Sequence, residues 1–225
     1  LANKIGRNDI TKRITDKLNE EFDDWFNYKP NETGKYFAFD ETWGGIVGYE
    51  TSGFGGENYN DHHFQYGYFI YTAAVLATLD DTFIDKYAKF VDQLTLDIAN
   101  TNRDHKVFPY LRYIDQYEGH SWATGFGDFF DGNNQESTSE AINAWYSVWL
   151  WAQVRNDENL KNFAEYLYSL EVNSARNYWL NWHNNKDIFP DEYGFSKTSL
   201  LWGGKFEYQT FFSMEPQSIE GIQYL

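Results

Sequence analysis

The sequence predicts a mainly α-helical domain built from helical hairpins, and two observations support this prediction. Apolar residues recur at intervals of three and four over much of the 225-residue chain, which is the spacing of one face of a helix. Turn-forming residues such as Asp80 and Asp81 separate neighbouring stripes, so successive helices are expected to run antiparallel. We expect five or six helices and one small β-hairpin. No linker or low-complexity tract divides the chain, so residues 1–225 are expected to form one domain.

The first half of the chain contains three expected helices and the hairpin. The first helix carries an apolar stripe made of Ile10, Ile14, Leu18, Phe22 and Trp25. Residues 35–51 alternate imperfectly around Gly44-Gly45, which is typical of a hairpin. The second helical stripe consists of Phe64, Tyr68, Tyr71, Val75 and Leu79. The third consists of Phe83, Tyr87, Val91, Leu94 and Ile98.

The second half begins with a long loop region and returns to helices. Residues 101–135 are rich in Gly, Asp and Asn and predict structured loops. A helix is expected from about 138 to 155, and a long helix carries Leu160, Phe163, Leu167, Leu170 and Tyr178. A last helix is expected near Pro216, because proline is favoured in a first turn. The sequence stops inside an apolar-periodic stretch, so we expect this chain to be part of a larger protein.

Composition excludes several classes of partner. The chain has 34 acidic and 18 basic side chains and a formal charge of −16, which repels nucleic-acid phosphates. No apolar run approaches the roughly 18–20 residues that cross a bilayer, so no membrane partner is expected. The absence of cysteine rules out disulfides and thiolate zinc sites. No phosphate-binding or dinucleotide motif is present, so no cofactor is expected.

Aromatic residues are unusually frequent, with 9 Trp, 18 Tyr and 19 Phe. Most are expected to lie in the core. Many, however, stand beside Gly, Asn and Asp, as in "NYNDHHFQYGYF" (58–69) and "YEGHSWATGFGDFF" (117–130). Aromatic rings with polar edges suit ligands that combine apolar faces with hydroxyl groups, and sugars are the leading example.

The segment "GNNQESTSEAIN" (132–143) places Glu136 and Glu140 four residues apart, where like charges on a helix repel by roughly 0.2–0.5 kcal/mol. One interpretation is a capping box, because Ser137-x-x-Glu140 matches S-x-x-E before an apolar run. The other interpretation places both carboxylates at a helix start facing a cavity. There the helix dipole favours the ionised form that a general base needs. Both interpretations hold together if Glu140 caps and Glu136 reacts.

Asp61 precedes the second helical stripe and has two readings. It is either an N-cap or a carboxyl group whose pKa is raised by aromatic surroundings, which would make it a general acid. The adjacent histidines, His62 and His63, point in different directions on a helix and lack ligand spacing, so no metal site is expected. A Ser–His–Asp system with Ser121 is disfavoured, because "HSWA" is not a nucleophile elbow. Two carboxyl groups on separate elements in aromatic surroundings favour glycoside hydrolysis.

Longer segments carry a resemblance to a known family. "NDHHFQYGYFIYTAAVLA" (60–77) and "HSWATGFGDFFDGNNQESTSEAINAWY" (120–146) closely resemble signature segments of glycoside hydrolase family 81, the endo-β-1,3-glucanases called laminarinases. "KYFAFDETWGGIVGYE" (35–50) and "SIEGIQYL" (218–225) resemble flanking family segments. The resemblance implies an inverting hydrolase with an (α/α)6-barrel catalytic domain, and a secreted protein. It also implies an N-terminal β-sandwich domain, which we do not expect within residues 1–225. Only half of the barrel's roughly twelve helices are countable, which indicates a C-terminal part of the catalytic module.

By this resemblance Asp61 is the general acid, Glu136 the general base and Glu140 an auxiliary carboxylate. Gln65 stands where family members often have His, and Gln cannot relay a proton. Trp43 is expected either to stack on a sugar or to be buried. The full set of expected sugar contacts is Tyr59, His63, Gln65, Tyr66, His120, Trp122, Asp128, Gln135 and Trp43.

The leading hypothesis is therefore a metal-independent endo-hydrolase of β-1,3-glucans. A non-catalytic glucan-binding module is the second hypothesis, because missing helices or Gln65 would abolish turnover while aromatic subsites persist. A lyase acting on acidic polysaccharide fits poorly, because these motifs offer no cation to neutralise uronate carboxylates.

Overall fold

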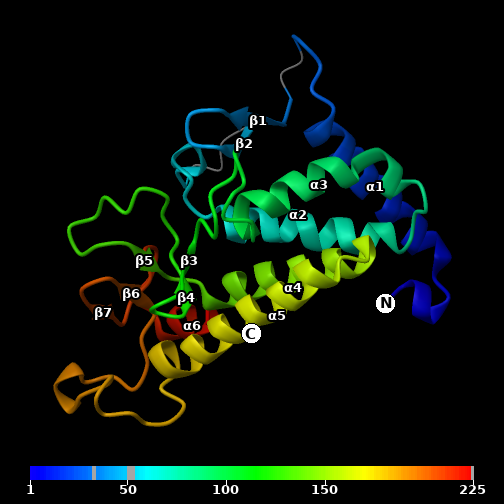
Figure 1. Cartoon of the computed structure of the whole chain (residues 1–225). Helices are drawn as coiled ribbons and strands as arrows, with labels where there is room; N and C mark the ends of the chain where they lie inside the picture. The colour runs from blue at the N-terminus through cyan, green and yellow to red at the C-terminus, as the bar shows by residue number, and fades with distance from the viewer. Residues whose placement is uncertain (32–33, 50–53, 224–225) are drawn as a thin grey trace.

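The computed structural model describes residues 1–31, 34–49 and 54–223, and its architecture is two stacked helical hairpins with loops gathered at one end. Its described α-helices are α1 (Asn8–Phe26), α2 (His62–Ala77), α3 (Phe83–Ala99), α4 (Thr138–Arg155), α5 (Glu158–Ser174) and α6 (Pro216–Gly221). Figure 1 shows the α2/α3 hairpin lying along the α4/α5 hairpin, with α2 against α4. The predicted mainly helical fold is confirmed.

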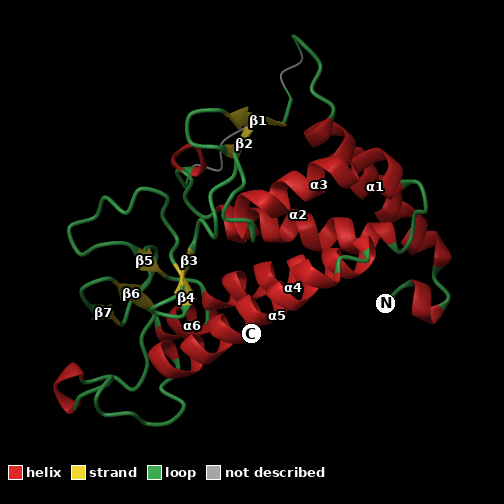
Figure 2. Ribbon diagram, in the orientation of Figure 1, coloured by secondary structure: helices red, strands yellow, loops and turns green. Residues whose placement is uncertain are grey.

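The strands are short and lie at the end of the molecule where α2 and α4 begin (Figure 2). β1 (Tyr36–Asp40) and β2 (Gly45–Tyr49) form an antiparallel hairpin in which Tyr36 pairs with Tyr49. This confirms the predicted hairpin over 36–49, while residues 50 and 51 of that prediction lie outside the described part of the chain. The remaining strands are β3 (Ile114–Asp115), β4 (His120–Ser121), β5 (Asn134–Gln135), β6 (Leu200–Trp202) and β7 (Phe206–Glu207).

The strands β3 and β4 pair with each other, and β5, β6 and β7 form an antiparallel sheet in that order. Short helical turns at Asn3–Ile5, Gly56–Asn58 and Asp191–Tyr193 punctuate the loops. The long helix predicted to reach Tyr178 ends as an α-helix at Ser174 and continues as a π-helical turn, Ala175–Trp179. Residues 101–135 form loops apart from these two-residue strands, as predicted.

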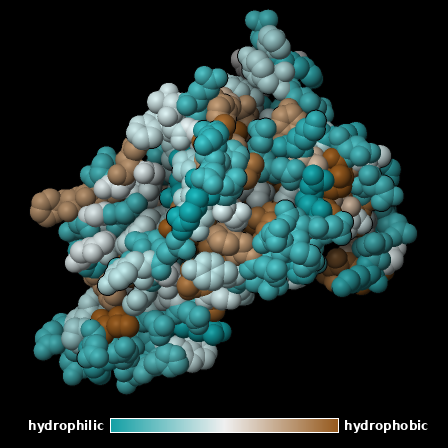
Figure 3. Space-filling model, viewed as in Figure 1, coloured by the Kyte–Doolittle hydropathy of each residue, from teal (hydrophilic) through white to brown (hydrophobic). Residues whose placement is uncertain are grey.

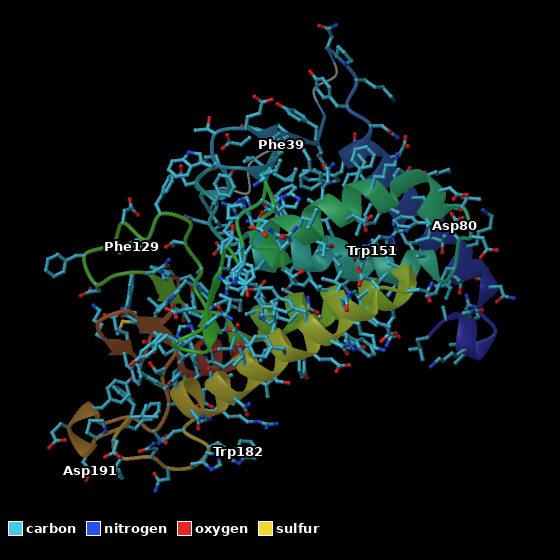
Figure 4. The ribbon with its side chains drawn as sticks, in the orientation of Figure 1. Phe39, Asp80, Phe129, Trp151, Trp182 and Asp191 are labelled. Carbon is cyan, nitrogen blue, oxygen red and sulfur yellow. The ribbon has the colours of Figure 1, made fainter. Side chains whose placement is uncertain are left out.

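The core lies between the helices. Trp151 is fully buried on α4, and its indole nitrogen donates to Asp92 Oδ1 of α3 at 2.9 Å. Figure 4 shows Trp151 amid the helices, with Asp80 at one end of the molecule and Phe129 on a loop at the other. Phe22 of α1 packs edge-on against Phe83 of α3 with ring centroids 5.1 Å apart, which attaches α1 to this core.

The stripe predicted for α2 is on the wrong face. Phe64 is buried, but Tyr68 is 52% exposed and Tyr71 40% exposed, and Val75 and Leu79 are exposed as well. The buried face instead centres on Tyr66, Gly67, Ile70, Ala73 and Ala74. The reason is that α2 packs against both α3 and α4 and is apolar nearly all round, so large residues do not mark the packed side. By contrast, all five residues of the stripe predicted for α3 are buried.

The molecular surface fits an acidic protein that is rich in aromatic residues. Figure 3 shows a largely hydrophilic face on which hydrophobic residues form separate patches. None of the described helices has the length and apolar character needed to cross a bilayer.

Candidate active site

Three carboxyl groups meet at the end of the molecule where α2 and α4 begin. Asp61 immediately precedes α2, Glu136 lies between β5 and α4, and Glu140 is in the first turn of α4. Their charges influence one another: those of Glu140 and Glu136 both raise the pKa of Asp61. The structure thus groups the three residues that the sequence singled out.

Asp61 has a left-handed backbone conformation with φ of 61°, which Asp tolerates better than most residues. Its amide donates to the carbonyl of Ala123 at 2.8 Å, and this bond fixes the start of α2 against the loop. Its side chain makes no capping bond, so the plain N-cap interpretation is wrong and the carboxyl group stays available. Burial, followed by the Glu140 and Glu136 charges, raises the pKa of this carboxyl to about 7.

Glu136 is half-buried, and its Oε1 accepts from the amide of Phe211 at 3.2 Å. The side-chain amide of Gln223 donates to the Glu136 carbonyl at 2.6 Å, which ties this segment to the end of α6. Burial and the Glu140 charge raise the pKa of Glu136, while the Phe211 amide lowers it. The helix dipole was expected to favour the ionised form, but burial outweighs it.

The capping box predicted at the start of α4 does not form. The Ser137 side chain makes no capping bond, and the Ser137 amide donates to Gln135 Oε1 at 3.1 Å. Gln135 therefore supplies the acceptor that Glu140 would have supplied in a capping box. Glu140 Oε1 instead accepts from the Tyr68 hydroxyl at 2.9 Å, across the α2/α4 interface.

A buried ionic cluster that the sequence analysis missed lies behind Asp61. His62 Nδ1 is 2.8 Å from Asp97 Oδ2, and His62 Nε2 is 2.7 Å from the carbonyl of Gly56. The His62 ring is thus held between a carboxylate and a backbone carbonyl. Asp97 Oδ1 also accepts from the Ile46 amide at 3.0 Å and lies 3.7 Å from Arg112 Nη2. Asp97 interrupts the apolar stripe of α3, and this interruption is the feature of the sequence that could have indicated the cluster.

Five of the expected sugar contacts are buried and bonded to protein groups: Tyr59, His63, Tyr66, His120 and Gln135. The Tyr59 hydroxyl, for example, donates to Asp40 at 2.9 Å, and the Tyr66 hydroxyl donates to the Ile46 carbonyl at 2.6 Å. Their positions support the walls of the site. As sugar contacts they stay predictions.

The other expected contacts are more accessible. Trp43 is 57% exposed on the turn of the β1–β2 hairpin, and its ring meets Phe126 edge-on at 5.5 Å. Trp122 is half-buried and donates to Asp115 Oδ2 at 3.1 Å, while Asp128 is exposed in the loop that follows. Gln65 is half-buried in the first turn of α2, and its amide donates to the Asp61 carbonyl at 2.9 Å.

An aromatic hollow of about 410 Å³ lies beside Glu136 and was not predicted. Its walls come from the β6–β7 region and the loop that follows, including Trp202 and the Phe211 that donates to Glu136. Phe129 meets Trp202 at 5.3 Å between centroids. This hollow is open to solvent, and its walls combine polar and aromatic side chains.

Metal coordination has no visible site in the described part of the chain. No group of three or more His, Cys, Asp or Glu side chains within residues 1–31, 34–49 and 54–223 is arranged to hold a metal ion.

The fold and the site define a helical-hairpin domain that presents a cluster of carboxyl groups at one end. Residues 1–225 match the glycosyl hydrolase family 81 C-terminal domain, and the chain belongs to this family. The family predicted by resemblance is therefore confirmed.

Named relatives agree with this assignment. The chain is 40% identical over 227 residues to a glucan endo-1,3-beta-D-glucosidase of Acetivibrio thermocellus, covering 100% of this chain and 29% of the relative. It is 34% identical to the primary septum glucan endo-1,3-beta-D-glucosidase of Schizosaccharomyces pombe, covering 84% of this chain and 19% of the relative. The chain thus spans less than a third of the length of these relatives.

A solved structure also matches. A glycoside hydrolase family 81 protein from Clostridium thermocellum, solved as a mutant, has a TM-score of 0.94 and 40% sequence identity. The match covers 100% of this chain and 31% of that chain. It confirms the predicted (α/α)6-type helical fold class.

Proposed function

We propose that this chain supplies the general acid and general base of an inverting hydrolase that cleaves β-1,3-glucan within the polymer. The relatives are named glucan endo-1,3-beta-D-glucosidases, which supports the substrate class. The observation that carries the assignment of roles is the electrostatic difference between the two carboxyls. Burial raises the pKa of both carboxyls, but it raises that of Asp61 to about 7, whereas the hydrogen bond from the Phe211 amide opposes the rise at Glu136.

In this mechanism Asp61 donates its proton to the glycosidic oxygen as the bond between that oxygen and the anomeric carbon breaks. Glu136 accepts a proton from a water molecule, whose oxygen bonds to the anomeric carbon from the opposite face. The product is an α-anomer with a free reducing end. The negative charge of Glu140 helps Asp61 to keep its proton until the transition state.

The two roles define a pH window. Asp61 acts in its protonated form, so activity falls as pH rises through about 7. Glu136 acts in its ionised form, so activity falls as pH drops through the pKa of that carboxyl, which lies above its usual value. The protein is expected to work best on the acidic side of neutrality.

Substrate binding is proposed at the aromatic surfaces around these carboxyls. The exposed face of Trp43 and the hollow beside Glu136 offer rings on which pyranose faces can stack. Because the polymer lies outside cells, we also propose that the protein is secreted.

We further propose that the chain acts as the C-terminal portion of a larger catalytic module. The exposed apolar residues of α2, Tyr71 and Val75 among them, form a stripe that further helices of an (α/α)6 barrel would cover. Hydrolysis of laminarin by residues 1–225 expressed alone, at the rate of the natural full-length protein, would contradict this proposal.

The decisive experiment is digestion of laminarin by the natural full-length protein and by its Glu136→Gln variant, with product anomers followed by NMR. Release of α-anomeric oligosaccharides by the wild type, lost in the variant, is the expected result. Release of β-anomers would overturn the inverting mechanism. Binding of laminarin without release of reducing ends would favour the non-catalytic glucan-binding module.

A further inference from the structure

A buried polar cluster lies behind the site, with Ser121 at its centre. Glu171 of α5 is almost completely buried and accepts the Ser121 amide on Oε2 at 2.9 Å. The Ser121 hydroxyl lies 3.1 Å from Glu171 Oε1. The indole nitrogen of Trp145 on α4 donates to Glu171 Oε2 at 3.0 Å. A buried carboxyl group with this many partners is anchored firmly in one orientation.

Ser121 also contacts the two segments that carry the proposed acid and base. Its hydroxyl is 3.1 Å from Nε2 of His63, which lies two residues after Asp61. The side-chain amide of Gln135, which immediately precedes Glu136, donates to the Ser121 hydroxyl at 2.7 Å and to the Ser121 carbonyl at 2.9 Å.

Backbone bonds reinforce the same connection. The Asp61 amide donates to the Ala123 carbonyl at 2.8 Å, and the Ala123 amide donates to the Asn134 carbonyl at 2.7 Å. Residues 121–123 therefore lie between the acid-bearing and base-bearing segments and hydrogen-bond to both.

We propose that Glu171 is a positioning residue that sets the placement of Asp61 and Glu136 through Ser121. This inference rests on the proposed function. Inversion needs a separation of roughly 6.5–9.5 Å between acid and base, so that one water fits between the base and the sugar. A displacement of about 1 Å in such a pair can reduce the rate by about 100-fold.

The hydrogen-bond inventory shows how the protonation state of the side chain at position 171 sets the direction of the Ser121 hydroxyl bond. When Glu171 is ionised, the Ser121 hydroxyl donates to Oε1 and accepts from Gln135 and from His63 Nε2–H, so the hydroxyl is saturated. If the side chain at position 171 is instead a hydrogen-bond donor to the Ser121 oxygen, the Ser121 hydroxyl must donate its own hydrogen bond to His63 Nε2. The His63 proton then moves to Nδ1, which is buried and has no hydrogen-bond partner.

Burial raises the pKa of Glu171 to about 7, and the Trp145 and Ser121 donors oppose this rise. Burial lowers the pKa of His63 to about 3, so the imidazole is neutral and its tautomer follows the state of Glu171. Glu171 is only 1% exposed, so its proposed effect on the reaction passes through Ser121.

The test is Glu171→Gln in the natural full-length protein, with laminarin as substrate. Glutamine keeps the side-chain volume and an acceptor for Trp145 and the Ser121 amide, but it presents an N–H toward the Ser121 hydroxyl. The expected result at pH 8, where the wild-type carboxyl is mostly ionised, is a fall in kcat of about 10- to 100-fold, with KM little changed and with the folded fraction unchanged by circular dichroism. At pH 6, where the wild-type carboxyl with its pKa of about 7 is mostly protonated and donates as glutamine does, the difference in kcat is expected to be smaller. A loss of packing alone would not separate kcat from KM.

The matched control is Glu165→Gln. Glu165 also lies on α5 and also accepts an indole N–H from α4, that of Trp149 at 2.8 Å, but at an exposed position away from Ser121. This variant is expected to keep the kcat of the wild type.

A second variant, Ser121→Ala, removes the hydroxyl and is expected to give the same selective loss of kcat. It decides the matter if Glu171→Gln does not fold. Unchanged kcat per folded molecule in the folded variants would overturn the inference while leaving the proposed function intact. A wild type that releases no sugar from laminarin would overturn the proposed function, and this inference with it.

Discussion

Substitution of Gly67 by alanine tests the packing that holds the two site-bearing helices together. Gly67 lies on α2 against α4, and a Cβ at this position would be 2.9 Å from Ala144 Cα and 3.0 Å from Ala144 Cβ. Carbon atoms in contact are normally about 3.5–4.0 Å apart. The substitution therefore forces α2 and α4 apart by about 0.5–1 Å, and Ala144 backbone atoms offer no flexible end that could yield.

The expected magnitude combines two opposed effects. Overpacking of this kind costs about 1–3 kcal/mol. Alanine in place of glycine within a helix stabilises by about 1 kcal/mol. The net expectation for Gly67→Ala is a loss of about 1–2 kcal/mol in the free energy of unfolding. Because α2 follows Asp61 and α4 follows Glu136, we also expect kcat on laminarin to fall by up to about 100-fold.

The assay is urea unfolding together with laminarin hydrolysis. Gly221→Ala is the stability control, because Gly221 is also helical and an added Cβ there meets nothing within 4 Å. That control should be neutral or stabilising by up to about 1 kcal/mol. Adding Ala144→Gly to Gly67→Ala should recover part of the loss once the effect of Ala144→Gly alone is subtracted, and the double variant together with both single variants gives the coupling energy of the contact. If Gly67→Ala matched the stability of Gly221→Ala and kept full activity, the close approach of the two helices would be refuted.

Three further predictions concern the charged groups. Glu140→Gln should move the alkaline limb of the laminarin pH–rate profile to lower pH, because the Glu140 charge raises the pKa of Asp61; an unmoved limb would contradict this role. Asp97→Ala should destabilise the protein by about 3–5 kcal/mol in urea unfolding, since it leaves the buried His62 ring and Arg112 without the carboxylate that they contact, and a loss below about 1 kcal/mol would contradict a stabilising role for Asp97. Between pH 4.5 and 8 the free energy of unfolding of the wild type should fall by about 3 kcal/mol relative to that of Glu171→Gln. The reason is that the folded carboxyl, with its pKa raised to about 7, keeps its proton over much of this range while the unfolded carboxyl ionises. Parallel curves of unfolding free energy against pH would contradict this prediction.

The sequence predicted the buried face of a helix correctly where one face packs on the core and the opposite face is exposed to solvent. The stripe of α3 was predicted correctly because that helix meets the core on one side. The stripe of α2 was wrong because its contact with α4 is made by small residues, Gly67 and Ala144 above all, and close packing of small residues leaves no sign in a pattern of large apolar ones. Helix contacts made by glycine and alanine cannot be predicted from the spacing of large apolar residues.

The carboxyl groups of the candidate site could be predicted from the sequence, but the buried polar residues behind them could not. Asp61, Glu136 and Glu140 stand in unusual local contexts, and the structure groups them; their catalytic roles stay predictions. Asp97 and Glu171 were missed because they lie on other helices, far along the chain. Each is a charged residue at helical spacing from a buried leucine; Glu171, for example, lies four residues after Leu167. A charged residue on an otherwise apolar helical face could have indicated these positions from the sequence.

The position of Asp61 poses an electrostatic question, because a helix N-terminus favours the ionised carboxylate whereas a general acid must hold its proton. The dipole contributes about 0.3–1 kcal/mol, which is less than one pKa unit. The pKa of Asp61 is nevertheless raised from 3.8 to about 7, equivalent to about 4 kcal/mol in favour of the protonated form. Burial and two like charges thus outweigh the dipole several-fold. They do so because the left-handed turn at Asp61 keeps its carboxyl out of the capping position, where the amides of α2 would have stabilised the anion.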